Sequence, residues 1–378
     1  MIENNLQSGV RHHAVDTDVF AYQTKKEGET VKYIVGYQAT DDGRFLREII
    51  AAKDAVREVY FSFGDFPNGR SSLAKEDGVP LYEKQKRQME DLETLARAGL
   101  SFNLLFNGNC YGRDSQSRAF FHKVGETVDY LGEKIGIASV TTSSPLIARF
   151  IRENFDGIDV RASVNMEIGS VEGLEYVADV FDSFYIKREC NRDAARLAVL
   201  REWCNKNGRE MYLLANSGCL NNCSAHTFHD NLVSHEAEIA AMDNGYAFEG
   251  VCWAFLGRED NRDKWLFRTN FIRPEDISLY APYTAAVKLA TRVNRDPCRV
   301  LRAYLAGGFS GGINTILEPD HSGALYPTVV ENKKLLADFG QTVMNCDRKC
   351  DTCGYCKQAM ENASVNLGGM YDVDKSND

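Results

Sequence analysis

Eight short apolar runs alternate with longer stretches of helical character, and this alternation is the feature that most constrains the fold. The runs are rich in branched and aromatic residues and lie at 33–38, 58–64, 102–110, 137–142, 160–165, 183–188, 211–216 and 285–292. Continuous apolar runs are typical of strands buried on both faces, and repeated strand–helix units imply a parallel sheet. Eight units in about 270 residues predict an α/β fold, a (β/α)8 TIM-like barrel. A doubly wound open sheet is the alternative, but no GxGxxG follows the first run.

The barrel prediction sets the expected domain boundaries. We expect an N-terminal arm at 1–30, the barrel at 31–305, a helical and loop extension at 306–340, and a cysteine-rich, cluster-binding tail at 341–378. No run of about 18 apolar residues occurs, and the polar N-terminus lacks the apolar core of a signal peptide. We therefore expect no membrane contact and a cytoplasmic location. The net charge of −10 argues against broad nucleic-acid binding, although it does not exclude a local basic site.

The tail contains four cysteines within eleven residues: Cys346, Cys350, Cys353 and Cys356. The total of eleven cysteines is odd and no export signal precedes them, so metal binding is favoured over a disulfide framework. One short loop with this spacing can wrap a [4Fe-4S] cluster, whereas structural zinc, the alternative, usually joins two separate knuckles. The first three cysteines match the spacing of radical S-adenosylmethionine enzymes. Their position after the last strand, together with the fourth cysteine, argues against S-adenosylmethionine as a cofactor.

A second group of metal-binding residue types follows the seventh strand, in LANSGCLNNCSAHTFH. On a helical turn Cys219, Cys223 and His226 would share one face, and His229 follows three residues later. Thiolate ligands suit iron–sulfur clusters and zinc alike. The alternative is a turn in which the cysteines pack and the histidines cap. Cys190 and Cys252 are candidates for further ligands, and a second [4Fe-4S] cluster is therefore possible.

The segments SVNMEIGS, SFYIKRECNRD, LLANSGCLNNCSAHTFH and NFIRPEDISLY with AAVKLATR resemble the peptidase U32-like family in their order and spacing. The resemblance covers about residues 30–305 and implies a barrel with its site after a late strand. The family is named for protease activity, and some branches resemble oxygen-independent hydroxylation proteins and tRNA-modifying proteins with a [4Fe-4S] cluster. Those clusters use four cysteines in the matching region, whereas this chain has two there, so the ligand set does not carry over whole.

The strand ends supply the other candidate residues, because active sites of such barrels lie at the C-terminal ends of the strands. Glu167 is the candidate acid or base, and convergent cations would bind a carboxylate or phosphate of the substrate. We predict as catalytic Glu167, Lys187, Arg188, His226 and His229. We predict as substrate-binding Asn107, Asn109, Arg161, Asn165, Asn216, Arg273, Lys288 and Arg292. The alternative for each charged residue is a salt bridge or a solvated surface position.

Three functions remain open at this stage. The first is an iron–sulfur enzyme that carries out an oxygen-independent redox or radical modification, such as hydroxylation or sulfur chemistry. Its substrate would be a small polar metabolite, a peptide or an RNA base, and an electron donor protein is a possible partner. The second is a U32-type metal-dependent peptidase, in which zinc activates water. The third is a non-catalytic barrel with a structural metal.

Overall fold

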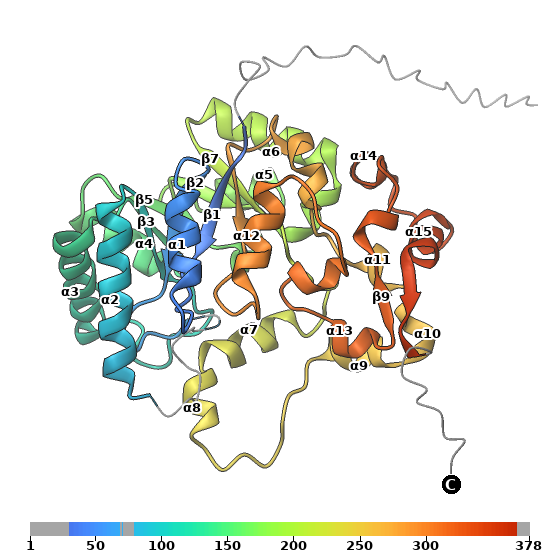
Figure 1. Cartoon of the computed structure of the whole chain (residues 1–378). Helices are drawn as coiled ribbons and strands as arrows, with labels where there is room; N and C mark the ends of the chain where they lie inside the picture. The colour runs from blue at the N-terminus through green and yellow to red at the C-terminus, as the bar shows by residue number, and fades with distance from the viewer. Residues whose placement is uncertain (1–29, 69, 71–78, 369–378) are drawn as a thin grey trace, which may run out of the picture.

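The computed structural model describes residues 30–68, 70 and 79–368. Eight parallel strands form a closed barrel, in which each strand pairs with the next and β8 returns to β1 (Figure 1). The strands are β1 (Lys32–Gly36), β2 (Val56–Phe61), β3 (Phe102–Phe106), β4 (Ser139–Thr142), β5 (Asp159–Ala162), β6 (Ser183–Tyr185), β7 (Glu210–Leu214) and β8 (Ala286–Leu289). The predicted (β/α)8 barrel is confirmed, and each of the eight apolar runs overlaps a strand.

Helices cover the outside of the barrel between successive strands (Figure 1). They are α1 (Arg44–Ala51), α2 (Leu81–Arg97), α3 (Arg118–Ile135), α4 (Pro145–Asn154), α5 (Val171–Glu175), α6 (Ala194–Lys206) and, after β8, α12 (Pro297–Leu305). In α3 the buried residues Val124, Val128 and Leu131 are spaced by four and three, which places them on one face toward the barrel. The Ser117 hydroxyl accepts a hydrogen bond from the Phe120 amide and caps the start of this helix.

The long connection between β7 and β8 departs from the simple repeat. It contains α7 (His226–Ser234), α8 (Glu236–Ala240), α9 (Val251–Gly257), α10 (Glu259–Arg262), α11 (Trp265–Arg268) and the 3-10 helix η3 (Pro274–Tyr280). In Figure 1, α7 and α8 lie below the barrel, where Asn109 after β3 donates its amide N–H to the Ser234 hydroxyl of α7. The connection therefore brings its cysteines and histidines to the C-terminal ends of the strands.

The C-terminal part of the chain packs beside the barrel, on the side of α9, α10 and α11 (Figure 1). It contains the 3-10 helix η4 (Ile313–Ile316), α13 (Ser322–Leu325), β9 (Thr328–Val330), the 3-10 helix η5 (Asn332–Lys334), α14 (Phe339–Met344), α15 (Tyr355–Ala363) and β10 (Ser364–Asn366). The antiparallel pairing of β9 with β10 joins the predicted extension to the predicted tail. The predicted arm at 1–30 lies almost entirely outside the described residues, and the domain boundaries stay predictions. Among the described residues, no helix has the length and apolar character needed to cross a membrane.

Some predicted strands are too long at their C-terminal ends. The third ends at Phe106 rather than at 110, and the sixth ends at Tyr185 rather than at 188. Residues after these points leave the ladder because the chain turns there. The 3-10 helices η1 (Val164–Met166) and η2 (Arg188–Arg192) occupy the turns after β5 and β6. These turns direct polar side chains over the end of the barrel.

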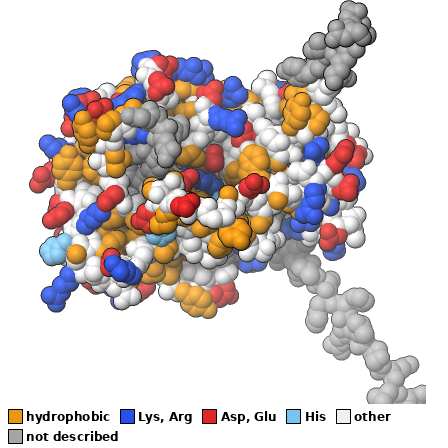
Figure 2. Space-filling view, turned by 90° about the horizontal axis from the view of Figure 1, so that it is seen from below, with side chains coloured by type: hydrophobic (Ala, Val, Ile, Leu, Met, Phe, Trp, Pro, Cys, Tyr) orange, Lys and Arg blue, Asp and Glu red, His pale blue; other side chains and the backbone are white. Residues whose placement is uncertain are grey.

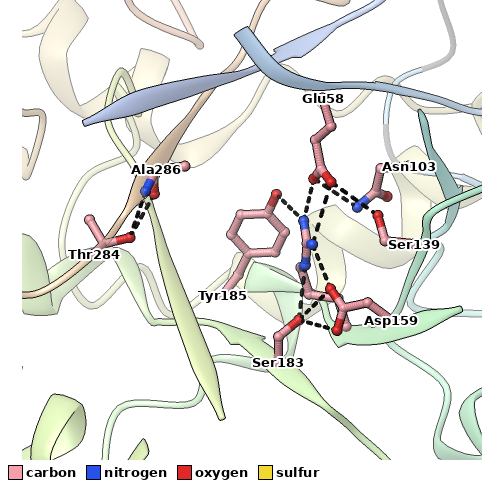
Figure 3. Close-up of polar contacts among 9 residues, drawn as sticks. Glu58, Asn103, Ser139, Asp159, Ser183, Tyr185, Thr284 and Ala286 are labelled. Atoms are coloured by element: carbon pink, nitrogen blue, oxygen red, sulfur yellow. Dashed lines mark hydrogen bonds and ion pairs between the residues drawn. The ribbon is translucent and has the colours of Figure 1, made fainter. Parts of the chain in front are cut away.

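The barrel interior holds a buried polar network, in which Figure 3 shows Glu58 and Asp159 facing the same guanidinium, that of Arg161. The Arg161 guanidinium pairs with Glu58 and with Asp159, and its Nε donates to the Ser183 hydroxyl. Glu58 also accepts hydrogen bonds from Asn103 and Ser139. Arg161 is 1% exposed and lies 4.2 Å from the centre of the Tyr212 ring. Arg161 was predicted to bind substrate, but the structure places it in this internal network, below the mouth of the barrel.

Candidate functional site

The C-terminal ends of the strands surround a cavity whose empty space, including the solvent at its mouth, is about 730 Å³. Its wall contains Tyr60 of β2, Leu214 of β7 and Lys288 of β8, with Asn107 and Asn165 from the turns after β3 and β5. Figure 2 views the molecule from below and shows charged side chains around a hollow near the middle of this face. The cavity therefore lies where catalytic sites of this fold are found.

Cations outnumber carboxylates in the wall of this cavity. The cations are Arg70, Arg188, Lys288 and Arg292, and the carboxylates are Asp230 and Glu318. Arg70 lies 3.9 Å from Glu318, and Glu318, Cys219 and Asp230 offset the effect of burial on Arg70 and raise its pKa. An excess of guanidinium and ammonium groups in a recess favours a substrate with a carboxylate or phosphate group.

Lys288 is the most unusual of these cations. It is 7% exposed, and its Nζ lies 4.1 Å from the centre of the Tyr60 ring and 4.8 Å from that of Tyr185. Burial, together with the nearby Arg292 and Arg161, holds the pKa of Lys288 well below its usual value. An anion in the cavity would favour the protonated form, so Lys288 is suited to bind or exchange a proton with a negatively charged substrate.

A second, smaller cavity of about 340 Å³ adjoins the first and shares Arg188 and Cys219 with it. The Glu167 carboxylate in its wall lies 3.1 Å from Lys187 Nζ and 3.3 Å from Arg188 Nη2. Glu167 adopts a left-handed backbone with φ 56°, which is uncommon for a residue other than glycine. Such backbone strain is concentrated at functional sites, and Glu167 combines it with two ion pairs.

His226 completes this group of charged side chains. Its Nε2 lies 2.8 Å from Arg188 Nη2 and 3.4 Å from Asp230 Oδ2, one helical turn along α7. A guanidinium can only donate, so His226 Nε2 accepts from Arg188 and the ring proton is on Nδ1. His226 is thus held between a cation on η2 and a carboxylate of its own helix, at the edge of the smaller cavity.

Three cysteines lie near one another beside these cavities. Burial raises the pKa of Cys252 to about 11, and the Cys219 and Cys223 thiols raise it further. A further cavity of about 670 Å³ contains Cys223 and Cys252 in its wall, with Arg258 and Arg268. The Arg268 Nε is buried without a hydrogen-bond partner among the described residues. Thiols, space and an unsatisfied guanidinium suit an anionic cluster, although no three Cys, His, Asp or Glu side chains in the described chain already stand at metal-binding distances.

The structure thus brings together many, but not all, of the predicted residues. Those that line the two adjoining cavities are Asn107, Asn165, Glu167, Lys187, Arg188, Cys219, Cys223, His226, Lys288 and Arg292. His229 packs against Phe248 with ring centres 5.3 Å apart, and burial lowers its pKa. Burial raises the pKa of Cys190 to about 11, and its charged neighbours are arginines and carboxylates.

Three predicted substrate-binding residues are outside the walls of the two cavities and bond to other parts of the protein. Asn109 donates its side-chain N–H to Asp230 and so fixes α7 over the barrel. Asn216 is fully buried, donates to the Ala290 and Ile316 carbonyls, and accepts from the Ala290 amide. Arg273 pairs in two places with Asp276 within its own turn.

Sequence reasoning missed several residues of the cavity wall. Asp230 had a usable signal, since it lies four residues after His226 and such pairs share a helix face. Arg70 and Glu318 had none, because they come from loops far apart in sequence that meet only in the folded chain.

The comparisons with known proteins agree with the sequence motifs. No family model matches the chain. An uncharacterized protease from Methanocaldococcus jannaschii is 24% identical over 81% of this chain and 88% of its own length. A solved U32 peptidase structure is 15% identical, covers 70% of this chain and 94% of its own, and has a TM-score of 0.49. A muconate lactonizing enzyme from Pseudomonas putida covers 53% of this chain and 51% of its own, with 16% identity and a TM-score of 0.31. The protease relative, with the motifs already described, supports a peptidase U32-like family for this chain.

Proposed function

We propose that the chain is an iron–sulfur enzyme of the U32-like type that modifies a small polar metabolite or a peptide with a carboxylate or phosphate group. One observation carries the proposal. Cys219 lies in the wall of both adjoining cavities, and after burial it has the largest effect on the pKa of Cys252. The cysteine group and the cation-lined cavity therefore meet at a single residue.

The chain's own residues would divide the work as follows. Cys219, Cys223 and Cys252 would hold a [4Fe-4S] cluster, with Arg268 as a neighbouring positive charge. When bound, such a cluster supplies electron transfer and, at an iron without a protein ligand, a Lewis-acid position.

Substrate binding and proton transfer would fall to the other side chains of the cavities. Arg188, Lys288 and Arg292 would orient the anionic group of the substrate. Glu167 would be the base of the smaller cavity, and His226, which lines the same cavity, is the second candidate for proton transfer. An electron donor protein would be needed for a reductive reaction, and it remains part of the proposal.

The test is the iron, sulfide and zinc content of protein purified without oxygen. The variant Cys219→Ser/Cys223→Ser should lose about four irons and four sulfides per chain. Cys110→Ser, which removes a partly exposed thiol outside the group, should lose none. Wild-type protein without iron and sulfide would refute the proposal, and one zinc per chain would point to the metal-dependent hydrolase.

A peptidase is the second candidate, favoured by the protease relative and by one feature of the site. The Cys219 thiol and the His226 imidazole line the same cavity, and Asp230 adjoins His226. A thiol, an imidazole and a carboxylate are the groups required for nucleophilic cleavage of an amide. Peptide cleavage that survives chelators but is lost in Cys219→Ser would favour this reaction, and chelator-sensitive cleavage would favour the zinc-dependent one.

A further inference from the structure

The loop that carries the tail cysteines contacts η2, the same 3-10 helix that begins with Arg188 of the candidate site. Cys346 follows α14, Cys350 and Cys353 lie in the loop, and Cys356 is in the first turn of α15. Arg348 in this loop donates to the Glu189 carbonyl of η2 over 3.2 Å and lies 3.3 Å from Asp193. The tail loop is therefore anchored on the helix that ends with Arg192.

Arg192 is buried beneath this loop and is only partly satisfied. It is 6% exposed, and its guanidinium lies between the rings of Phe271 and Phe339, at 5.3 and 5.5 Å from their centres. Its Nη1 donates to the Leu266 carbonyl over 2.7 Å, while Nε and Nη2 have no hydrogen-bond partner among the described residues. A buried cation with two unsatisfied donors is costly unless an anion balances it.

The tail thiols are the groups in position to supply that anion. After burial, the groups with the largest effects on the pKa of Arg192 are Cys356, Tyr280, Cys346 and Cys350, and none of these is a carboxylate. Thiols become thiolates when they bind metal, and a four-thiolate cluster is negatively charged. The cluster would thus provide a negative counter-charge for the Arg192 guanidinium.

The loop can close around a cluster without disturbing the core. Cys346, Cys350 and Cys353 are exposed, and Cys356 is partly buried. A Cβ built on Gly354, between the last two cysteines, would meet no atom within 4 Å, so nothing packs against the loop at this point. The four thiols are not at the distances from one another that a shared metal site requires, so their side chains have to rotate toward one another. Rotation of the exposed side chains displaces no buried neighbour.

We propose that Cys346, Cys350, Cys353 and Cys356 bind a [4Fe-4S] cluster whose negative charge is balanced by the buried guanidinium of Arg192. This site is separate from the barrel cysteines. The five residues of η2 connect the two, with Arg188 at the mouth of the barrel and Arg192 under the tail. The proposal does not depend on the proposed reaction, because a tail cluster can be present whether or not the barrel cysteines hold one.

The experiment compares iron and sulfide in anaerobically purified wild type, Cys350→Ser/Cys353→Ser and the control Cys110→Ser. The tail variant should lose about four irons and four sulfides per chain and the matching visible absorption, while the control keeps them. Unchanged iron and sulfide in the tail variant, or loss of zinc in their place, would overturn the proposal. Running Cys219→Ser/Cys223→Ser in parallel separates failure of this proposal from failure of the barrel site.

A second pair of variants tests the role of Arg192 even if the tail variant folds poorly. Arg192→Met removes the charge and keeps an unbranched side chain, whereas Arg192→Lys keeps a positive charge. A positive charge favours the reduced, more negative cluster, so Arg192→Met should lower the reduction potential of the tail cluster. Arg192→Lys should stay closer to wild type. An unchanged potential in Arg192→Met would refute the charge-balancing role.

Discussion

Replacing Glu58 by Gln should destabilise the barrel by about 3 kcal/mol, because it removes one partner of a buried ion pair. The side chains of Glu58 and Arg161 are 5% and 2% exposed, so water cannot solvate the Arg161 guanidinium once the Glu58 charge is removed. Removing one member of such a pair costs about 3–5 kcal/mol. The lower end applies here because Arg161 keeps Asp159, 2.6 Å from its Nη2, and the Ser183 hydroxyl.

Urea unfolding of wild type and Glu58→Gln, followed by circular dichroism, measures this difference. The matched control is Glu90→Gln, which removes a carboxylate that is 65% exposed and 4.0 Å from Lys86. The control should change the free energy of unfolding by no more than about 0.5 kcal/mol. A loss below about 1 kcal/mol in Glu58→Gln would refute the view that this internal pair stabilises the barrel.

Two further predictions follow from single positions. Lys288→Met should stabilise the fold by on the order of 1 kcal/mol at neutral pH and weaken the binding of small dianions such as phosphate, measured by urea unfolding and calorimetry. Because the folded state lowers the pKa of Lys288, its unfolded state binds the proton more strongly. The advantage of the variant should therefore grow as pH falls below about 10.5, the usual lysine value, and a pH-independent difference would contradict this. Gly340→Ala should cost about 1–3 kcal/mol, since the new Cβ would lie 2.3 Å from Asp276 Cγ. Gly132→Ala, within α3 and in open space, should instead gain about 0.5–1 kcal/mol, and equal melting temperatures for the two would argue against the clash.

The sequence alone was sufficient to predict the barrel. Buried parallel strands read as continuous apolar runs, and the run around Leu104 and Leu105 shows the pattern clearly. Strand ends were less accurate, because polar residues such as Asn107 and Arg188 fit the last position of a strand as well as the turn that follows it. The pairing of β9 with β10 was not predicted, since three-residue strands from distant segments leave no periodic signal.

The candidate site was only partly predictable for a similar reason. Local spacing found Cys219, Cys223 and His226, which share one short segment. It could not distinguish Lys288, which lines the cavity, from Arg161, which is paired inside the barrel, because both are cations on a strand. Which anionic group balances a given cation is visible only in three dimensions. Arg192 is an example, because the tail cysteines near it are more than 150 residues away in the sequence.

The most direct test of the central claim is the iron and sulfide content of a barrel triple variant, Cys219→Ser/Cys223→Ser/Cys252→Ser, purified without oxygen beside wild type. The account predicts that wild type holds about eight irons per chain in two clusters and that the triple variant keeps about four, those of the tail. A triple variant with the same iron and sulfide as wild type would show that the mouth of the barrel holds no cluster, and the proposed function would be wrong.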